Sequence, residues 1–456
     1  MGFGLQMGGV GALATLGGDS TLSSAFGVTV GGRELGLFGT TGFFLSAEAF
    51  TPAVAALFLF QMMFMDAACT IPTGALAERW KFASFVLFGF AMSTVIYPVY
   101  AHWVWGGGWL SALGRNYGLG HGHVDFAGSS AVHLTGGVAA LVGARLVGPR
   151  IGKFGPDGTP RGIPGHNLAL AMTGTFVLAF GWFGFNAGST LAATDLRTAI
   201  VAVNTMLSSA AGAFAATLHT WRGFGKPDPT WMCNGMLAGL VAITAPCAFV
   251  DAPSAVLIGG LAGVLVVKAA TFVEETLRID DPVGAIAVHG ANGAWGILAL
   301  GLFANGSYGE GLNGVPGGVR GLFYGDSGQF FAALIGIGAN VYRYPTSSPD
   351  VTRITRSAPD WHSSCTKSAR LARSKLPENP SPGPSVRVLA TAPMADREWG
   401  IRPSFDEQSA PSDSQGFHGV CERIRAITGR FAERTPPPFS AGHGRRTGKS
   451  GDAHTD

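Results

Sequence analysis

"DFAGSSAVHLTGG", residues 125–137, places one carboxylate, Asp125, and one imidazole, His133, in a stretch of otherwise small, apolar or hydroxyl-bearing residues. The stretch returns as "DPVGAIAVHGANG", residues 281–293, which aligns with it without gaps. The alignment pairs residues of identical type: Asp125 with Asp281, Gly128 with Gly284, Ala131 with Ala287, Val132 with Val288, His133 with His289 and Gly137 with Gly293. Two copies of one motif indicate an internal repeat.

The chain is too apolar for a typical soluble protein. Of its 456 residues, 47% are hydrophobic and 13% are charged, whereas soluble domains carry about 25% charged residues. Apolar stretches close to the roughly 20 residues that cross a bilayer recur along the sequence. They lie near residues 50–72, 84–105, 126–148, 166–188, 197–220, 231–250, 253–273 and 283–304. The composition therefore predicts an all-α membrane protein, a polytopic helical bundle surrounded by the lipid bilayer.

The two copies of the motif are predicted to cross the bilayer in opposite directions, because four predicted spans separate them. This pattern is typical of an inverted-topology repeat, whose binding site lies near the membrane midplane between the repeats. Each histidine follows its aspartate by eight residues, or about 12 Å of helix, against roughly 15 Å for half of the hydrocarbon core. We therefore expect His133 and His289 to enter from opposite faces and to meet near the middle.

Basic residues divide the loops into two sets. The richer set contains Arg79, Lys81, Arg145, Arg150, Lys153, Arg161, Arg222, Lys226 and Arg278. The poorer set contains Arg33, Arg115, Arg197 and Arg320. Because positive residues gather in cytoplasmic loops, the richer set is predicted to face the cytoplasm. Residues 343–456 carry 17 Lys and Arg against 12 Asp and Glu, so the basic excess belongs to this tail and gives no indication that the bundle binds nucleic acid.

The character of the sequence changes after residue 340. Residues 341–456 are rich in Pro, Ser and Arg without a regular period, which predicts a disordered tail. Residues 1–340 are predicted to form a transmembrane domain of about eight complete spans, with partial spans at both ends. The cysteines form no CxxC pair and are interpreted as small hydrophobic residues; they are Cys69, Cys233, Cys247, Cys365 and Cys421.

Ionisable residues at membrane depth are costly, so they suggest a functional role. A single such histidine could simply hydrogen-bond two helices, but two in matching motifs favour a pore. A neutral pair can share one hydrogen bond and offer sites that relay protons. Metal binding is disfavoured because no third ligand is apparent nearby. Asp125 is expected to cap its helix, and its carboxylate would also attract cations to the outer vestibule.

Three aromatic stretches accompany the repeat. Phe60 and Phe64 lie four residues apart, Trp105 ends one predicted span, and Phe185 and Ser189 end another. Aromatic faces attract cations, with tryptophan the strongest. By residue type alone, however, these side chains are also typical of the aromatic belts at a membrane surface.

The stretches "GALAERWKF", "AHWVWGGGWL", "DFAGSSAVH", "GWFGFNAGS" and "VHGANGAWG" resemble signature motifs of the ammonium transporter family. They follow the family order across roughly residues 1–340. The resemblance implies a non-enzymatic membrane protein without a cofactor or metal, with an eleven-span bundle of inverted halves. It also implies a homotrimer with one pore per subunit. The expected location is a cell membrane, the inner membrane of a bacterium.

The resemblance also assigns roles to individual residues. Phe64, Trp105 and Ser189, with Phe60 adjacent, match the outer site that recruits ammonium, and Asp125 matches the acidic residue beneath it. Phe64 and Phe185 match a stacked phenylalanine gate. His133 and His289 match the twin histidines that line the pore. Ammonia and the proton are then expected to cross by separate but coupled paths, which moves net charge.

The sequence also departs from the family pattern. It is expected to lack the first span and most of the second, and to lose the pattern after about Asn340, as a frameshift near Val341 would produce. An inactive truncated remnant is therefore one alternative, and an ammonium sensor that uses the same pore is another. A gas channel of the Rhesus type is disfavoured by the presence of Trp105. A PII-type regulator could dock on the cytoplasmic loops.

Overall fold

The computed structural model describes residues 1–9, 21–46, 50–192 and 194–342. The predicted disordered tail lies outside the described residues from residue 343 onward. Cys365 and Cys421 belong to this part of the chain. Cys69, Cys233 and Cys247 are buried and free, as expected of small hydrophobic residues.

Among the described residues, seven helical segments are long and apolar enough to cross a membrane. They are α2 (Pro52–Ala75); α3 (Phe82–Ala91) with η3 (Met92–Ile96) and α4 (Tyr97–Trp105); η4 (Ser129–Leu134) with α6 (Thr135–Val147); α7 (Leu168–Asn186) with η5 (Ala187–Thr190); α8 (Arg197–Phe224); α10 (Ala252–Thr271) with η6 (Phe272–Thr276); and η7 (Ile286–Ala291) with α11 (Asn292–Phe303). The predicted all-α membrane bundle is confirmed.

Two further helices are shorter. The span predicted near residues 231–250 appears as α9 (Pro229–Ile243), and residues 244–250 form turns before Asp251 begins the next helix. Pro246 lies in these turns, where its missing N–H and fixed φ disfavour a continued helix. The final helix, α12 (Ser327–Tyr342), follows the short helical turns η8 (Leu312–Gly314) and η9 (Leu322–Tyr324).

The N-terminal region contains a small hairpin that the apolar pattern does not predict. Strands β1 (Ala25–Val30) and β2 (Arg33–Gly39) pair antiparallel, and Gly31 and Gly32 join them with positive φ values of 57° and 77°. Such a two-residue turn favours glycine. The remaining short elements are α1 (Gly2–Met7), η2 (Phe43–Leu45) and α5 (Leu113–Tyr117).

Polar side chains mark where several helices begin. In each case a side-chain oxygen accepts a hydrogen bond from a backbone N–H in the first turn: Thr51 from Val54, Asn167 from Leu170, Asp228 from Thr230 and Asp251 from Ser254. Proline occupies the first helical position of α2 and α9 and the second position of α10. Both features satisfy or remove the free N–H groups of a helix start.

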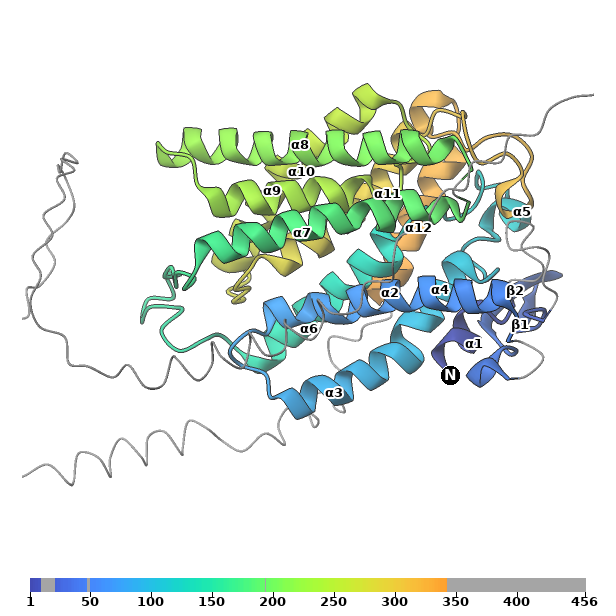
Figure 1. Ribbon diagram of the computed structural model, residues 1–456, viewed down its shortest axis with the longest axis horizontal. Coiled ribbons are helices and arrows are strands. Elements are labelled where there is room, and N and C mark those ends of the chain that lie inside the picture. Colours follow the sequence, from blue (N-terminus) through green and yellow to red (C-terminus); the bar gives the residue numbers. More distant parts are fainter. Residues whose placement is uncertain (10–20, 47–49, 193, 343–456) are drawn as a thin grey trace, which may run out of the picture. The chain divides into compact units, whose positions relative to one another are not determined.

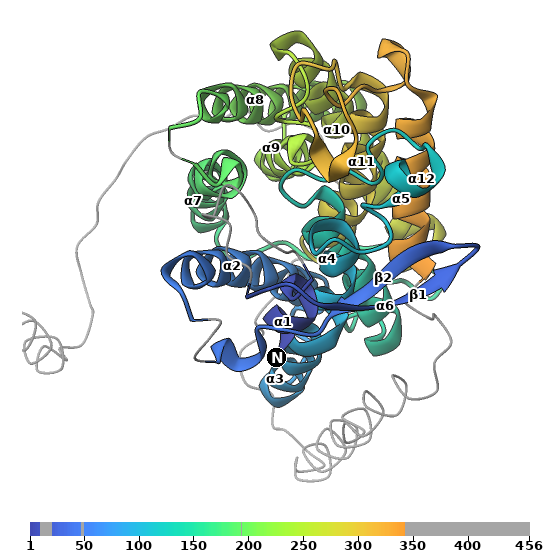
Figure 2. The same ribbon diagram turned by 90° about the vertical axis from the view of Figure 1, so that its right-hand side faces the viewer.

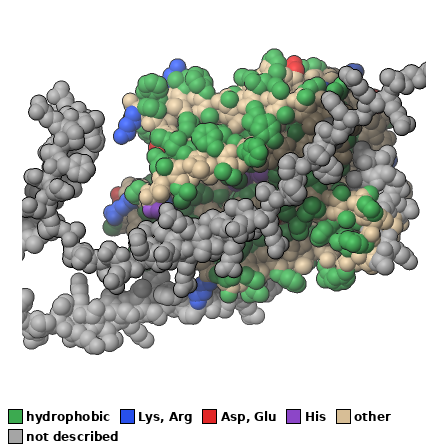
Figure 3. Space-filling model, viewed as in Figure 1, with side chains coloured by type: hydrophobic (Ala, Val, Ile, Leu, Met, Phe, Trp, Pro, Cys, Tyr) green, Lys and Arg blue, Asp and Glu red, His purple; other side chains and the backbone are tan. Residues whose placement is uncertain are grey.

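Helices α7, α8, α9 and α10 lie side by side, and α2 packs against α6 (Figures 1 and 2). The flank of the bundle is apolar, with hydrophobic side chains spread over its surface (Figure 3). On α7, for example, Phe176, Val177 and Phe180 are all more than half exposed. In water such a surface would be unfavourable, so this flank fits contact with lipid.

Buried hydrophobic residues form two main clusters. The larger draws mainly on α8, α9, α10 and α11, and the second mainly on α2, α6 and the chain between them. Phe126 and Phe185 pack against both clusters. They therefore lie at the junction between the two halves of the repeat, where an inverted repeat is expected to place its site.

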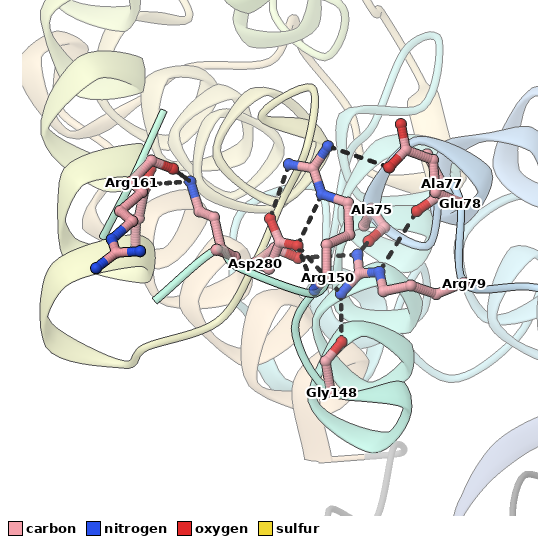
Figure 4. A network of polar contacts seen from close by, with 10 residues as sticks. Ala75, Ala77, Glu78, Arg79, Gly148, Arg150, Arg161 and Asp280 are labelled. Atoms are coloured by element: carbon pink, nitrogen blue, oxygen red, sulfur yellow. Dashed lines mark hydrogen bonds and ion pairs between the residues drawn. The ribbon is translucent and has the colours of Figure 1, made fainter. Parts of the chain in front are cut away.

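An ion-pair network joins three loops at the end of the bundle predicted to face the cytoplasm (Figure 4). Asp280, whose side chain is fully buried, binds Arg150 at 2.9 Å and lies 3.7 Å from Arg79. Arg79 also donates to the carbonyls of Ala75 and Gly148, at the ends of α2 and α6. Both arginines belong to the richer set of basic loop residues, which predicts the cytoplasmic side. The same two side chains also connect the loops through Asp280.

We expect Asp280→Asn to lower the free energy of unfolding by about 3 kcal/mol, because it leaves two buried arginines without their carboxylate. Although burial opposes ionisation, the hydrogen bonds and charges of Arg150 and Arg79 lower the pKa of Asp280. The stabilisation is therefore present at neutral pH and is lost as the pH falls through this lowered pKa, below the usual value of about 3.9. Thermal unfolding in detergent across pH measures both effects.

Glu78→Gln is the matched control. Glu78 also pairs with Arg150, at 3.8 Å, but its side chain is 69% exposed. Exposed pairs contribute at most about 1 kcal/mol, so this variant should unfold close to the wild-type temperature. Equal losses in the two variants would contradict the assigned role of Asp280.

Candidate functional site

Each copy of the repeated motif contains a glycine with positive φ just before a π-helical turn. Gly128 has φ 111° before η4, and Gly284 has φ 75° before η7. The π-helical turns contain His133 and His289 respectively. A positive φ strains residues with a side chain, and π-helical turns are frequent at functional sites. The repeat in sequence is thus also a repeat in backbone conformation.

The two aspartates of the motif cap these turns. The Asp125 carboxylate accepts hydrogen bonds from four backbone N–H groups and from the Ser130 hydroxyl, at 2.7 to 3.0 Å. The Asp281 carboxylate accepts from Ala285 and Ile286 at 3.0 and 2.7 Å. Burial raises the pKa of Asp281 to about 6. Both carboxylates thus accept hydrogen bonds from backbone N–H groups at the start of their helices, as a capping residue does.

The two motif histidines lie against each other. Nδ1 of His133 is 3.2 Å from Nδ1 of His289, and the ring centroids are 5.2 Å apart. One ring must donate this hydrogen bond and the other must accept it, so both can be neutral. Nε2 of His133 is buried and has no hydrogen-bond partner among the described residues. The pair therefore retains a polar atom that could meet a small polar ligand.

Glycines allow the two copies to approach closely enough for this contact. A Cβ added at Gly137 would lie 2.3 Å from the backbone nitrogen of Gly290, and one at Gly293 would lie 2.6 Å from the carbonyl oxygen of Ser129. These clashes are with backbone atoms, which cannot move aside as a flexible side chain can. The paired Gly137 and Gly293 of the alignment thus let the helices cross where the histidines meet.

A continuous stack of aromatic rings leads to the histidines. Phe64 stacks on Phe185 with centroids 4.3 Å apart and an interplanar angle of 28°. Phe185 lies 5.5 Å from the ring of His133. Phe60 lies 4.6 Å from Phe64 on the same helix. Rings from α2, α7 and η4 thus form one contiguous stack that ends at the first histidine.

The other candidate residues contact this stack of rings. Trp105 meets Phe64 edge to face at 5.8 Å, and its indole N–H donates to the backbone carbonyl of Asp125 at 2.7 Å. The Ser189 hydroxyl donates to the carbonyl of Phe185 at 2.7 Å, which leaves its oxygen lone pairs as acceptors. The structure thus connects Trp105 directly to Phe64 and Asp125. It connects Ser189, in η5, to Phe185, in α7, by one hydrogen bond.

Two contacts were not predicted from the sequence. Trp182 stacks on His133 at 5.4 Å and 15°, and its N–H donates to the Thr244 hydroxyl at 3.0 Å. Its position three residues before Phe185 was an available signal, because residues so spaced share a helix face. His123 was also missed; its Nε2 lies 2.9 Å from the Ser130 hydroxyl.

In the part of the chain that the structure describes, no group of three or more His, Cys, Asp or Glu residues is placed to hold a metal ion. The site consists instead of aromatic rings, two imidazoles, a hydroxyl and a capped carboxylate.

These features define a multi-pass helical membrane protein whose two inverted motif copies meet at a pair of histidines beneath stacked aromatic rings. The chain belongs to the Ammonium Transporter Family, whose model matches residues 18–344.

Relatives and solved structures agree with this assignment. The chain is 50% identical over 312 residues to ammonium transporter Amt2 of Archaeoglobus fulgidus, covering 68% of this chain and 66% of that protein. It is 44% identical to ammonium transporter Amt1 of Haloferax mediterranei, covering 55% and 51%. The chain therefore spans between about half and two thirds of these curated relatives.

Among solved structures, the chain is similar to one described as Sensor Amt Protein, with a TM-score of 0.62, 32% identity, and coverage of 79% of this chain and 85% of that one. It is also similar to Mep2 of Candida albicans, with a TM-score of 0.58, 28% identity, and coverage of 75% and 69%.

Proposed function

We propose that this protein carries ammonium across a membrane as ammonia and a proton, through the space between its two inverted halves. The single observation that carries this proposal is the contact between His133 and His289 at the end of the aromatic stack. The curated relatives are named ammonium transporters, which supports the choice of substrate and a role in nitrogen uptake. A transport role of this kind involves no enzymatic step and no cofactor.

The first step of the proposal is recruitment of the cation on the outer side. Trp105 and Phe64, with Phe60 adjacent, present aromatic rings, and the Ser189 oxygen can accept a hydrogen bond. Ring faces attract a cation through the quadrupole, by about 0.5 to 2 kcal/mol. The buried negative charge of Asp125, whose carbonyl orients Trp105, raises the local attraction for a cation further.

The second step is loss of the ionic charge at the Phe64 and Phe185 rings. Their stacked faces leave no polar group to replace the water around an ion, and an unpaired ion in such surroundings is strongly disfavoured. Ammonium can shed a proton and continue as neutral ammonia. Potassium is of similar size but cannot, so the same constriction excludes it.

The third step is passage along the histidine pair. Ammonia can both donate and accept hydrogen bonds, which matches an imidazole pair with one unpartnered buried nitrogen. The rings of Trp182 and Phe185, which lie 5.6 Å from each other, both pack against the His133 ring and restrict its orientation. The proton follows a separate path in this proposal, so transport moves net charge.

The proposal extends to the setting of the protein. The multi-pass helical bundle belongs in a membrane, and we place it in the plasma membrane of a prokaryotic cell. Apolar side chains exposed on α8 and α10, including Phe214 and Leu257, would suit contact with neighbouring subunits, which supports a homotrimer. A PII-type regulator, if one binds, would meet the basic loops around Arg150.

A second candidate function is ammonium sensing through the same path, which the likeness to the solved Sensor Amt Protein favours. Such a protein would bind the cation at the outer rings and signal without needing a high transport rate.

Uptake of radiolabelled methylammonium into proteoliposomes tests the proposal. We expect uptake that excess ammonium abolishes and an equal concentration of potassium leaves intact, because potassium cannot lose charge at the constriction. Binding without uptake would favour the sensor, and neither binding nor uptake would leave an inactive relative of the family as the correct reading.

A further inference from the structure

His123 is a buried titratable residue for which the proposed transport path has no use. It is fully buried, and it lies in the segment before the first motif, outside the membrane-spanning helices. Its surroundings are tightly packed: a Cβ added at Gly336 on α12 would lie 1.9 Å from its Nδ1. A buried histidine that is held so closely usually has a specific polar partner.

That partner is the Asp125 carboxylate, reached through one hydroxyl. Nε2 of His123 lies 2.9 Å from the Ser130 hydroxyl, which donates to Oδ2 of Asp125 at 2.7 Å. Because the Ser130 proton points toward Asp125, the Ser130 oxygen accepts from His123, so the proton of a neutral His123 ring is on Nε2. The ring, the hydroxyl and the carboxylate therefore form one buried hydrogen-bonded chain.

The charged group that acts on His123 is Asp125, at the other end of the hydrogen-bonded chain. The neutral groups packed around the His123 ring are the Tyr100 ring on α4, 6.5 Å away, and Gly336 and the backbone of Ala332 on α12. Burial lowers the pKa of His123, while Asp125 and the Ala332 backbone raise it by smaller amounts. His123 is therefore neutral at neutral pH, and it gains its charge below the ordinary histidine value of about 6.5.

We propose that His123 is a positioning residue that acts through Ser130 on Asp125, and that its protonation weakens the attraction of the outer site for ammonium. The imidazolium charge offsets the carboxylate charge that favours a cation beside Trp105. By reciprocity, a bound cation and a proton on His123 each disfavour the other. The inference rests on the proposed function, since it concerns the affinity of that site.

The test is the apparent KM for ammonium, from initial currents of proteoliposomes, with the inside pH fixed and the outside pH varied. In the wild type we expect the KM to rise by about tenfold between about pH 7.5 and about pH 4.5, with a smaller change in the maximal current. His123→Gln keeps an N–H donor for Ser130 but cannot titrate. It should show less than about a twofold rise.

Two further variants separate this role from a general packing effect. His121→Gln is the matched control, because His121 is also buried but its ring contacts the carbonyl of Gly317; it should keep the wild-type pH dependence. Ser130→Ala interrupts the chain and should flatten the dependence even if His123→Gln proves unstable.

A wild-type KM that stays constant with pH would overturn the inference, and so would the same rise in wild type and His123→Gln. Complete absence of wild-type current would instead overturn the proposed function, and this inference with it.

Discussion

His133→Ala is expected to abolish the preference of the transporter for ammonium over potassium or to stop transport altogether. The substitution removes the Nδ1 contact with His289 and the ring that stacks against Trp182 and Phe185. A lost hydrogen bond to a buried polar group costs about 1 to 3 kcal/mol, which is a factor of roughly 5 to 160 in rate or selectivity. Currents after matched ammonium and potassium jumps measure it.

His166→Ala serves as the control, because His166 is exposed in the loop before α7. It should leave both current and selectivity at the wild-type level. If His133→Ala behaved the same way in a folded protein, the histidine pair would have no role in conduction.

Gly137→Ala is expected to destabilise the protein by about 3 kcal/mol or more and to stop transport in any protein that still folds. The new Cβ would lie 2.3 and 2.4 Å from the backbone nitrogen and Cα of Gly290, next to His289. Overpacking usually costs about 1 to 3 kcal/mol, and more where rigid atoms must move. Separation of the two helices would also pull the imidazoles apart. Thermal unfolding in detergent and current in proteoliposomes report the two effects.

The matched control is Gly174→Ala on α7, since a Cβ there has no heavy atom within 4 Å. This change should be neutral or stabilising by up to about 1 kcal/mol, because alanine has the higher helix propensity. Comparable destabilisation in both variants would show that the Gly137 contact has no special importance.

Much of the fold can be predicted from the sequence because the relevant signals are local. Apolar runs identify most of the spans. The run that contains α9 continues through residues 244–250, but α9 ends at Ile243 because Pro246 disfavours a continued helix. The β1–β2 hairpin is missed because its residues follow no clear alternation. The π-helical turns are missed because the apolar pattern does not distinguish them from α-helix.

The part of the candidate site that can be predicted from the sequence is the part that the internal repeat indicates. The aligned motifs predict that His133 meets His289, and the structure places their nitrogens 3.2 Å apart. The roles of Phe64, Phe185, Trp105 and Ser189 in transport stay predictions. Contacts between residues that have no equivalent in the other motif copy cannot be predicted from the sequence alone. Asp280 pairs with Arg79 across about two hundred residues, and His123 needs the fold of η4 to reach Ser130.

The electrical response of the reconstituted wild-type chain to paired concentration jumps on a solid-supported membrane tests whether the path is selective for ammonium. We expect a transient current on an ammonium jump, which saturates with concentration, and no current on a potassium jump of the same size. Equal currents for both cations, or none for ammonium from a folded protein, would contradict the claim that the two motif copies form an ammonium-selective path.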